Sequence, residues 1–299
     1  RDFLFYLSVD PILRKNYHDQ LTLSTLYAYS EHYILTLGSR DVGSLEEFMA
    51  KLPGDEKQKL AQVREAYSYM MVHPGCKMMA PGAAIPEELG KCIQALNTLY
   101  KSSPALYQMD DEYDGFEWVQ LMKYEENVIT FLRKTEKPEE TLLVICNFAA
   151  IPYENYQVGV PFAGKYKEIF NSDAVEFGGE GVVNSRVKTA KAEECDEREY
   201  SIKVKLPALG VSIYSCTPGK APARKKVTAA KTAKDKTAKD KTAGKLVRTV
   251  KAKTPAKKSV KEEKATKVEE AVKAEKKAET VKKRATVKND NNKADRNSK

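Results

Sequence analysis

The sequence is short of the residues that build metal centres and disulfide frameworks. Its 299 residues include five Cys and three His, and the cysteines stand singly and far apart. An odd, scattered set of cysteines argues against a disulfide framework and against a zinc site. We therefore expect reduced thiols, no bound metal and no cofactor.

Long apolar runs are missing as well. No stretch reaches the roughly 18 apolar residues that a membrane span needs. The first residues do not have the pattern of a signal peptide. The sequence therefore predicts a cytoplasmic protein that does not bind a membrane.

Charge is divided unevenly along the chain, although the formal net charge is +9. Residues 219–299 hold 28 Lys and Arg against 10 Asp and Glu, a net of +18, which leaves −9 for residues 1–218. The basic part consists largely of Lys, Ala and Thr, and TAKDK occurs there twice in succession. Such a segment buries too little apolar surface to offset its ordering entropy, so we predict a disordered tail over residues 218–299. Clustered cations can bind polyanions without sequence preference, and a merely solubilising tail is the alternative.

The first hundred residues alternate between strand and helix patterns. A short apolar run at residues 33–37 and another at residues 76–80 read as buried strands. Helices are expected at residues 44–52, 55–72 and 87–101, and Ser44 with Glu47 forms the sequence of a capping box. In the second of these helices an apolar stripe is expected to be buried, and the Lys and Glu positions are expected to face water. The stripe consists of Leu60, Val63, Tyr67, Met70 and Met71. This order is typical of a parallel α/β fold, but two such units cannot close a barrel or form a stable sheet of their own.

From Asp114 onward the apolar period changes to two, which is typical of strands. We expect antiparallel strands at residues 115–122, 127–133, 141–148, 156–160, 166–170, 200–206 and 209–215. The run Leu142–Phe148 is apolar throughout and predicts a strand that is buried on both faces. Residues 107–217 are therefore expected to form an all-β domain.

A longer pattern links these elements to a known family. The stretch NFAAIPYENYQVGVPFAGKYKEIFNSD, which starts at Asn147, resembles the C-terminal all-β domain of glycogen branching enzymes, members of the α-amylase family. Upstream, DPILRK, LTLSTLYAYSEHYILTL, KLPGD and HPGCK resemble segments around the last two barrel strands of these enzymes. The resemblance covers residues 2–217. It implies the last βα units of a (β/α)8 barrel at residues 1–106, an antiparallel β-sandwich at 107–217 and the tail beyond.

The resemblance also implies a reaction. Branching enzymes cut an α-1,4-glucan chain and rejoin it through an α-1,6 link, with a carboxylate nucleophile, an acid/base and a stabilising Asp. In the family, the nucleophile and the acid/base lie on barrel strands four and five, and the resemblance begins after both. The implied partners are glycogen-like or amylose-like α-glucan chains and the upstream barrel segments.

The stabilising carboxylate of the family lies in a Ser-His-Asp-Glu-Val motif after the seventh strand, where this chain has Gly38-Ser39-Arg40-Asp41-Val42. Aligned without a gap, Ser39 replaces the His and Arg40 replaces the Asp. Shifted by one residue, Ser39 and Asp41 match, Arg40 replaces the His, and the Glu is lost. Asp41 is thus the candidate transition-state stabiliser, and a polar loop without chemistry is the alternative. No substrate-binding residue is predicted.

A second departure lies after the eighth strand. The family has a long loop there with aromatic and charged residues, whereas Met78–Pro86 runs almost directly into the next helix. Both departures fall where an active site is expected. Three hypotheses remain open: part of a branching enzyme with an altered active site, a non-catalytic glucan-binding or scaffold relative, and a polyanion binder acting through its tail.

Other residues that could bind ligands are expected to have structural roles. Four aromatic residues could stack on sugar rings, but their strand patterns favour the core: Trp118, Tyr153, Tyr156 and Tyr166. Four acidic residues form what we interpret as a solvated turn rather than a cation site: Asp110, Asp111, Glu112 and Asp114. His18 and His32, which lie beside apolar segments, are also expected to be structural.

Overall fold

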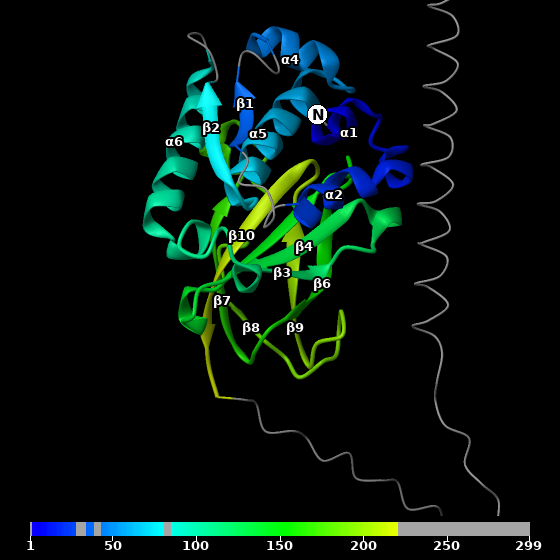
Figure 1. Cartoon of the computed structure of the whole chain (residues 1–299). Coiled ribbons are helices and arrows are strands. Elements are labelled where there is room, and N and C mark those ends of the chain that lie inside the picture. The colour runs from blue at the N-terminus through cyan, green and yellow to red at the C-terminus, as the bar shows by residue number, and fades with distance from the viewer. Residues whose placement is uncertain (1, 28–33, 39–42, 81–84, 221–299) are drawn as a thin grey trace, which may run out of the picture. The chain divides into compact units, whose positions relative to one another are not determined.

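The computed structural model describes residues 2–27, 34–38, 43–80 and 85–220, all within one compact unit (Figure 1). The first half contains helices and a short sheet, in the order α1 (Asp2–Ser8), η1 (Arg14–Tyr17), α2 (Asp19–Tyr27), β1 (Ile34–Gly38), α4 (Leu45–Lys51), α5 (Glu56–Val72), β2 (Cys76–Ala80) and α6 (Glu87–Ser102). The predicted tail lies outside the described residues apart from its first three positions. No described helix is long and apolar enough to span a membrane.

Local capping signals define where α4 and α5 begin. The Ser44 hydroxyl accepts a hydrogen bond from the Glu47 N–H, and the Glu47 carboxylate accepts one from the Ser44 N–H. Asp55 and Gln58 form the same reciprocal pair at the start of α5. Because each box satisfies two otherwise unpaired backbone donors, both helices begin within one residue of the predicted positions.

The two strands of the first half pair in parallel. Ile34 lies opposite Cys76, and Gly38 lies opposite Ala80. Because α4 and α5 connect the strands, β1, its helices and β2 form the βα pattern that the sequence predicts.

The second half is dominated by a six-stranded sheet in the order β3-β4-β5-β10-β7-β8. Its strands are β3 (Phe116–Gln120), β4 (Val128–Arg133), β5 (Leu142–Asn147), β7 (Gly164–Asn171), β8 (Lys188–Thr189) and β10 (Gly210–Pro218). All neighbouring pairs are antiparallel, as predicted. Short 3-10 turns join several elements, among them η2 (Pro104–Leu106), η3 (Tyr113–Gly115), η4 (Tyr124–Glu126), η5 (Pro138–Glu140) and η6 (Val175–Phe177).

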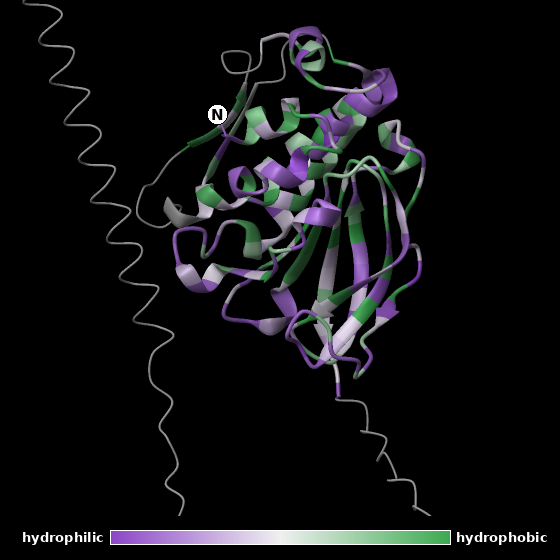
Figure 2. Ribbon diagram, turned by 90° about the vertical axis from the view of Figure 1, so that its right-hand side faces the viewer, coloured by the Kyte–Doolittle hydropathy of each residue, from purple (hydrophilic) through white to green (hydrophobic). Residues whose placement is uncertain are grey.

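The six-stranded sheet lies between two other layers. A two-stranded sheet of β6 (Tyr153–Val160) and β9 (Tyr200–Leu206) covers one face, and the helices cover the other. Along β5, Leu143 and Ile145 face β6 and β9, whereas Val144 and Cys146 face the helices. This explains why the strand reads as one apolar run (Figure 2 shows the helices above the strands).

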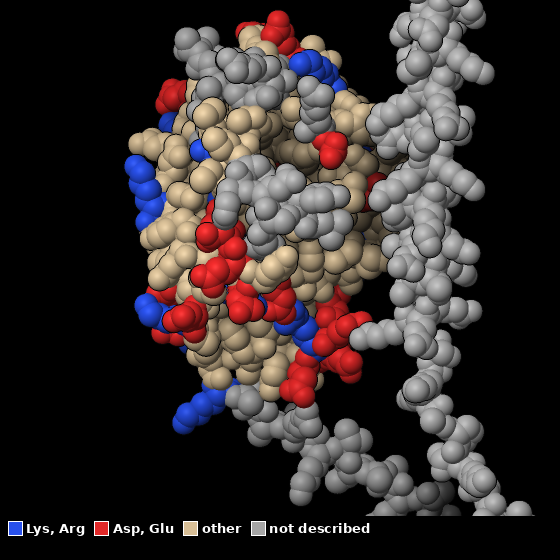
Figure 3. Space-filling model, in the orientation of Figure 1, with Lys and Arg blue, Asp and Glu red and all other residues tan. Residues whose placement is uncertain are grey.

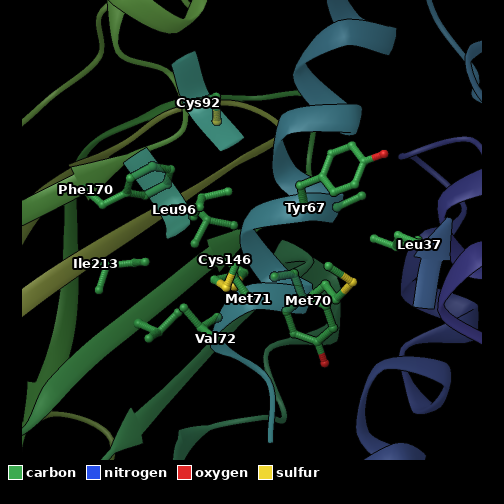
Figure 4. Packing of buried hydrophobic residues seen from close by; sticks show 14 of the residues in the cluster. Leu37, Tyr67, Met70, Met71, Val72, Cys92, Leu96, Cys146, Phe170 and Ile213 are labelled. Atoms are coloured by element: carbon green, nitrogen blue, oxygen red, sulfur yellow. The ribbon is translucent and has the colours of Figure 1, made fainter. Parts of the chain in front are cut away.

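Helix α5 runs through the centre of the helical layer. Its Met71 and Val72 pack toward Cys146 and Ile213 of the sheet, whereas Met70 lies on the side of β1, toward Leu37 (Figure 4). The apolar stripe of this helix was predicted, but the expectation that its Glu positions face water was wrong for Glu65, which is fully buried. Glu65 is buried because α1, η1 and β5 meet around it: Tyr6, Arg14 and Cys146 of these elements all lie close enough to interact with its charge.

One hydrophobic core crosses the predicted boundary between residues 106 and 107. It joins Leu96 of α6 and Val63 of α5 to Phe131, Val144 and Ile213 of the sheet. The division into a barrel portion, 1–106, and a β-domain, 107–217, therefore stays a prediction about the parent fold.

Candidate functional site

The candidate site is the edge at which β1 and β2 both end. Since the strands are parallel and Gly38 pairs with Ala80, the segments that follow them leave from neighbouring positions. Ser39, Arg40 and Asp41, the residues singled out by the resemblance, lie outside the described residues. The connection from Ala80 to the start of α6 at Glu87 is as short as the sequence indicates.

Among the residues that the structure describes, none covers one face of the β1–β2 sheet. Leu37 is buried against α5, but Ile34 is 56% exposed and Met78 is 51% exposed on the opposite face. In a closed barrel such a face points inward and packs against the other strands. A cavity of about 470 Å³ lies beside β1, between α1, α2 and α5.

A buried Ser–His pair lines this cavity but lacks the features of a catalytic dyad. The Nε2 atom of His73 lies 2.8 Å from the Ser24 hydroxyl, and Nδ1 lies 2.8 Å from the Pro74 carbonyl oxygen. Burial lowers the pKa of His73 to about 4. An imidazole that resists protonation this strongly is a poor general base at neutral pH. We therefore interpret the pair as structural.

A charged clasp holds the start of β2 against the β-domain. The Asp110 carboxylate accepts hydrogen bonds from the Gly75 N–H at 2.9 Å, from Lys77 at 3.3 Å and from the fully buried Arg133 at 2.5 Å. Burial lowers the pKa of Lys77 to about 8, and the Asp110 charge opposes that shift. The clasp links β2 to β4, and it corrects the interpretation of Asp110 as part of a solvated turn.

A second buried cation, Arg14 of η1, forms hydrogen bonds with groups of the core. Arg14 donates hydrogen bonds to the carbonyl oxygens of Val9, Leu7 and Phe148, and to Gln62. The carboxyl of Glu65 is also fully buried, and neither of its oxygens has a hydrogen-bond partner. Burial raises the pKa of Glu65 well above its usual range, and the Arg14 charge opposes that shift. The hydrogen bonds of Arg14 join η1 to α1, to α5 and to the residue that follows β5.

The aromatic residues named as sugar-stacking candidates belong to the folded core, as expected for most of them. Tyr156 and Tyr166 are buried, and Trp118 and Tyr153 are partly buried in aromatic clusters. The aromatic residue with the most exposed side chain in the described ranges is instead Tyr113, which is 73% exposed. Its sequence context gives a signal, because Tyr113 lies among the acidic residues of the predicted solvated turn.

The histidine and acidic candidates show no metal-binding arrangement. No group of three or more His, Cys, Asp or Glu residues is placed to hold an ion within the ranges that the structure describes. The Nε2 atom of His18 lies 2.6 Å from the Leu121 carbonyl oxygen, in a structural position, and His32 lies outside those ranges. Asp111, Glu112 and Asp114 are exposed, as expected for a solvated turn.

Comparisons with known proteins support the resemblance. Residues 118–217 match the family described as alpha amylase, C-terminal all-beta domain. A 1,4-alpha-glucan branching enzyme from Oceanobacillus iheyensis is 37% identical over 235 residues, covering 71% of this chain and 37% of the relative. One from Aquifex aeolicus is 38% identical over 235 residues, covering 70% of this chain and 37% of the relative. A solved α-amylase from Anoxybacillus is 10% identical, with a TM-score of 0.36 over 60% of this chain and 36% of its own.

The chain spans little more than a third of the length of these branching enzymes. The match covers about 70% of this chain and is therefore longer than the β-domain alone. The chain therefore belongs to the α-amylase family and corresponds to the C-terminal part of its 1,4-α-glucan branching enzymes.

Proposed function

We propose that this chain serves as the C-terminal part of a 1,4-α-glucan branching enzyme, forming α-1,6 branches in a glycogen-like polymer in the cytoplasm. The observation that carries the proposal is the identity of 37% over 235 residues, which covers 71% of this chain. The substrate is an α-glucan chain, and the partners are the barrel segments that precede this part in the relatives.

The uncovered face of β1 and β2 supports the role of those barrel segments. Ile34 and Met78 expose large apolar side chains on a sheet of only two strands, and an isolated pair of strands is marginally stable in water. Further barrel strands would cover that face and align the ends of β1 and β2 with the strands that carry the nucleophile and the acid/base.

The segment after β1 supplies the candidate chemistry. We assign the stabilising carboxylate to Asp41, with Ser39 beside it and Arg40 in the place of the family's His. In the other alignment, a guanidinium occupies the carboxylate's position, where positive charge develops on the sugar, and would oppose the reaction. Because the connection between β2 and α6 is short where the family has a long loop, we expect a more open substrate site at this edge.

A chimera tests this proposal. Residues 1–218 replace the matching C-terminal 37% of the Oceanobacillus enzyme, and branching is followed by iodine absorbance of amylose and by chain-length analysis after debranching. We expect branching activity, and we expect Asp41→Ala to lower it by about 100-fold to 1,000-fold. A folded chimera without activity would contradict the proposal.

The same chimera distinguishes the two alignments. If Arg40 occupies the carboxylate position, the double replacement Ser39→His with Arg40→Asp raises activity, and Asp41→Ala has little effect. If Asp41 is the stabiliser, the double replacement gives no gain. A non-catalytic relative would show no response to either change.

The basic tail supports a second binding activity of this chain. Its net charge of +18 favours polyanions, whereas the acidic body, with a net of −9, repels them. Figure 3 shows acidic side chains gathered on the lower half of the face it presents. Polyanion binding by the full chain should weaken steeply with salt and disappear when residues 219–299 are removed.

A further inference from the structure

A cavity of about 320 Å³, which we call the α5 cavity, lies beside the first half of α5. One wall is the face of α5 that carries Lys57, Gln58, Ala61 and Arg64. The other walls are the loop that follows β7, the segment that follows β5 and the turn that precedes β10. The volume falls within the range of about 300–1,000 Å³ that is usual for small-molecule sites. Neither the family resemblance nor the proposed reaction assigns a role to this cavity.

A buried guanidinium lines the α5 cavity. Arg64 is 6% exposed, and its Nε atom donates a hydrogen bond to the Ser172 carbonyl oxygen at 2.9 Å. Among the described residues, none accepts a hydrogen bond from either Nη atom of Arg64, and none forms an ion pair with it. Neither Nη atom belongs to the fully enclosed polar atoms that lack a partner, so both keep some surface open to the cavity. The fold thus holds a positive charge in place and leaves two of its donor atoms available to a ligand.

The acidic neighbour of Arg64 is engaged elsewhere. Asp173 also lines the cavity, at 7% exposure, but its two carboxylate oxygens accept hydrogen bonds from the backbone N–H groups of Glu180, at 3.0 Å, and Val182, at 2.9 Å. Burial lowers the pKa of Arg64, although the Asp173 charge opposes that shift. Because a buried charge is costly unless it is paired, an anionic partner in the cavity would stabilise this arrangement.

Two further lining residues on α5 offer donors. The side-chain carbonyl of Gln58 accepts a hydrogen bond from the Asp55 N–H at 3.1 Å, and no described residue accepts one from its amide nitrogen. Lys57 is exposed, and it forms no ion pair within the described ranges. With a rise of about 1.5 Å per residue, the donors from Lys57 to Arg64 lie within about 10 Å along the helix. Glu180 is the exposed acidic residue of the lining, and it would oppose an anion.

These donors suit an oxyanion better than other ligands. Lys57 and Arg64 repel a metal cation, and a neutral sugar would leave the charge of Arg64 unpaired. The backbone N–H groups of Gly178, Gly179 and Glu180 already have acceptors within their own loop, so recognition depends on side chains. A guanidinium presents its N–H groups in a fixed fork that fits two oxygens of one carboxylate or phosphate.

We propose that the α5 cavity binds a small oxyanion, with its carboxylate or phosphate group on the Nη atoms of Arg64 and within reach of Gln58 and Lys57. The inference goes beyond the proposed function and does not depend on it, because the lining residues all belong to this chain and do not react. Such a ligand would connect α5 with the loop that follows β7.

The test follows the Arg64 side chain itself by NMR. The full chain is labelled with nitrogen-15, and the Nε–H signals of its arginines are recorded during titration with sodium phosphate and, separately, with sodium acetate. The Arg64 signal is identified by its absence from the spectrum of Arg64→Lys or, if that variant does not fold, by correlation with the backbone. We expect the Arg64 signal to shift and to saturate with at least one probe. The probe with the lower dissociation constant identifies the group that the cavity prefers.

Arg14 provides an internal reference in the same spectrum. Its guanidinium is fully buried and already donates hydrogen bonds to Val9, Leu7, Phe148 and Gln62, so its signal should not move. Anions attracted to the lysines of residues 219–299 do not affect this measurement, because the two signals report on the folded part alone.

A pair of charge reversals locates the binding site on α5. Lys57→Glu changes an exposed lining residue, and we expect it to raise the dissociation constant by about tenfold or more. Lys59→Glu is the matched control, because Lys59 does not line the cavity. At about 0.15 M ionic strength its charge is screened, so we expect a change of less than about twofold. Glu180→Gln should lower the dissociation constant.

Three results would overturn the inference. The first is an Arg64 signal that moves with neither probe. The second is a shift of equal size at Arg64 and Arg14, which would report a general effect of salt. The third is an equal dissociation constant in wild type, Lys57→Glu and Lys59→Glu. The chimera tests the proposed reaction separately, since an inactive chimera leaves the NMR result unchanged.

Discussion

The six-stranded sheet and the β1–β2 sheet differ in how many of their faces are covered by other elements. In the six-stranded sheet, Val144 and Ile145 of adjacent positions are both fully buried, because layers cover both faces. In the β1–β2 sheet, Leu37 is buried, but Ile34 is more than half exposed. The six-stranded sheet is thus covered on one face by β6 and β9 and on the other by the helices. The β1–β2 sheet is covered on the α5 face, and its other face exposes Ile34 and Met78.

The largest expected effect is a difference in unfolding free energy between substitutions in the two sheets. Phe131→Ala removes a ring that packs against Phe116 and Trp118 at 5.1 and 5.6 Å, and should lower the free energy of unfolding by about 3–5 kcal/mol. Ile34→Ala, on the uncovered face, should change it by less than about 0.5 kcal/mol. Urea unfolding followed by circular dichroism measures both. A large loss in Ile34→Ala would show that this face is covered in solution and would break the comparison.

The next effect concerns the clasp that joins the two sheets. Asp110→Ala leaves the buried Arg133 without its carboxylate partner and removes the acceptor of Lys77 and of the Gly75 N–H. We expect a loss of about 3 kcal/mol in unfolding free energy, the lower end of the range for breaking a buried pair. Asp111→Ala is the control, because that side chain is exposed and should contribute less than about 0.5 kcal/mol. Equal losses in both variants would mean that the clasp does not hold β2 in place.

The parts of this comparison that could be predicted depend on local signals. The capping residues Ser44 and Asp55 define the starts of α4 and α5 from within four residues of sequence. The strand Cys76–Ala80 has the predicted bounds, since Pro74 and Gly75 end the helix before it. The uninterrupted apolar run of β5 predicts burial on both faces, which the structure confirms.

The parts that could not be predicted depend on segments that meet only in the fold. Glu65 occupies a position typical of a solvated helix face, and α1 and η1 bury it. Asp110 belongs to an acidic turn, and it is withdrawn from solvent by Lys77 and Arg133, which are distant in sequence. The question at Asp41 is different in kind, since two alignments of one motif imply opposite chemistry.

The third prediction concerns His73, which follows α5, and the dependence of the free energy of unfolding on pH. Burial lowers the pKa of His73 to about 4, so the folded state binds fewer protons than the unfolded state between about pH 6.5 and pH 4. Stability is therefore present above pH 6.5 and falls as the pH approaches 4, by roughly 3 kcal/mol from this group. His73→Asn should remove that part of the pH dependence in urea unfolding. If wild type and variant lose stability in parallel over this interval, His73 is not buried in its neutral form.

The last prediction concerns Glu65, which lies on α5 between the two sheets. Its effect on stability has the opposite dependence on pH to that of His73. Burial raises its pKa, so above about pH 4.5 the folded state holds a proton that the unfolded state releases. The wild-type protein then loses stability as the pH rises, by up to about 1.4 kcal/mol per pH unit, until the folded pKa is reached. Glu65→Gln carries no titrating group and should gain stability relative to wild type from pH 5 to pH 7. Glu56→Gln, at an exposed position on the same helix, should show no such trend. A different outcome is that Glu65→Gln is less stable than wild type by a constant amount at every pH. The Glu65 carboxylate would then be ionised and paired with Arg14, and an ion pair would stabilise the contact between η1 and α5.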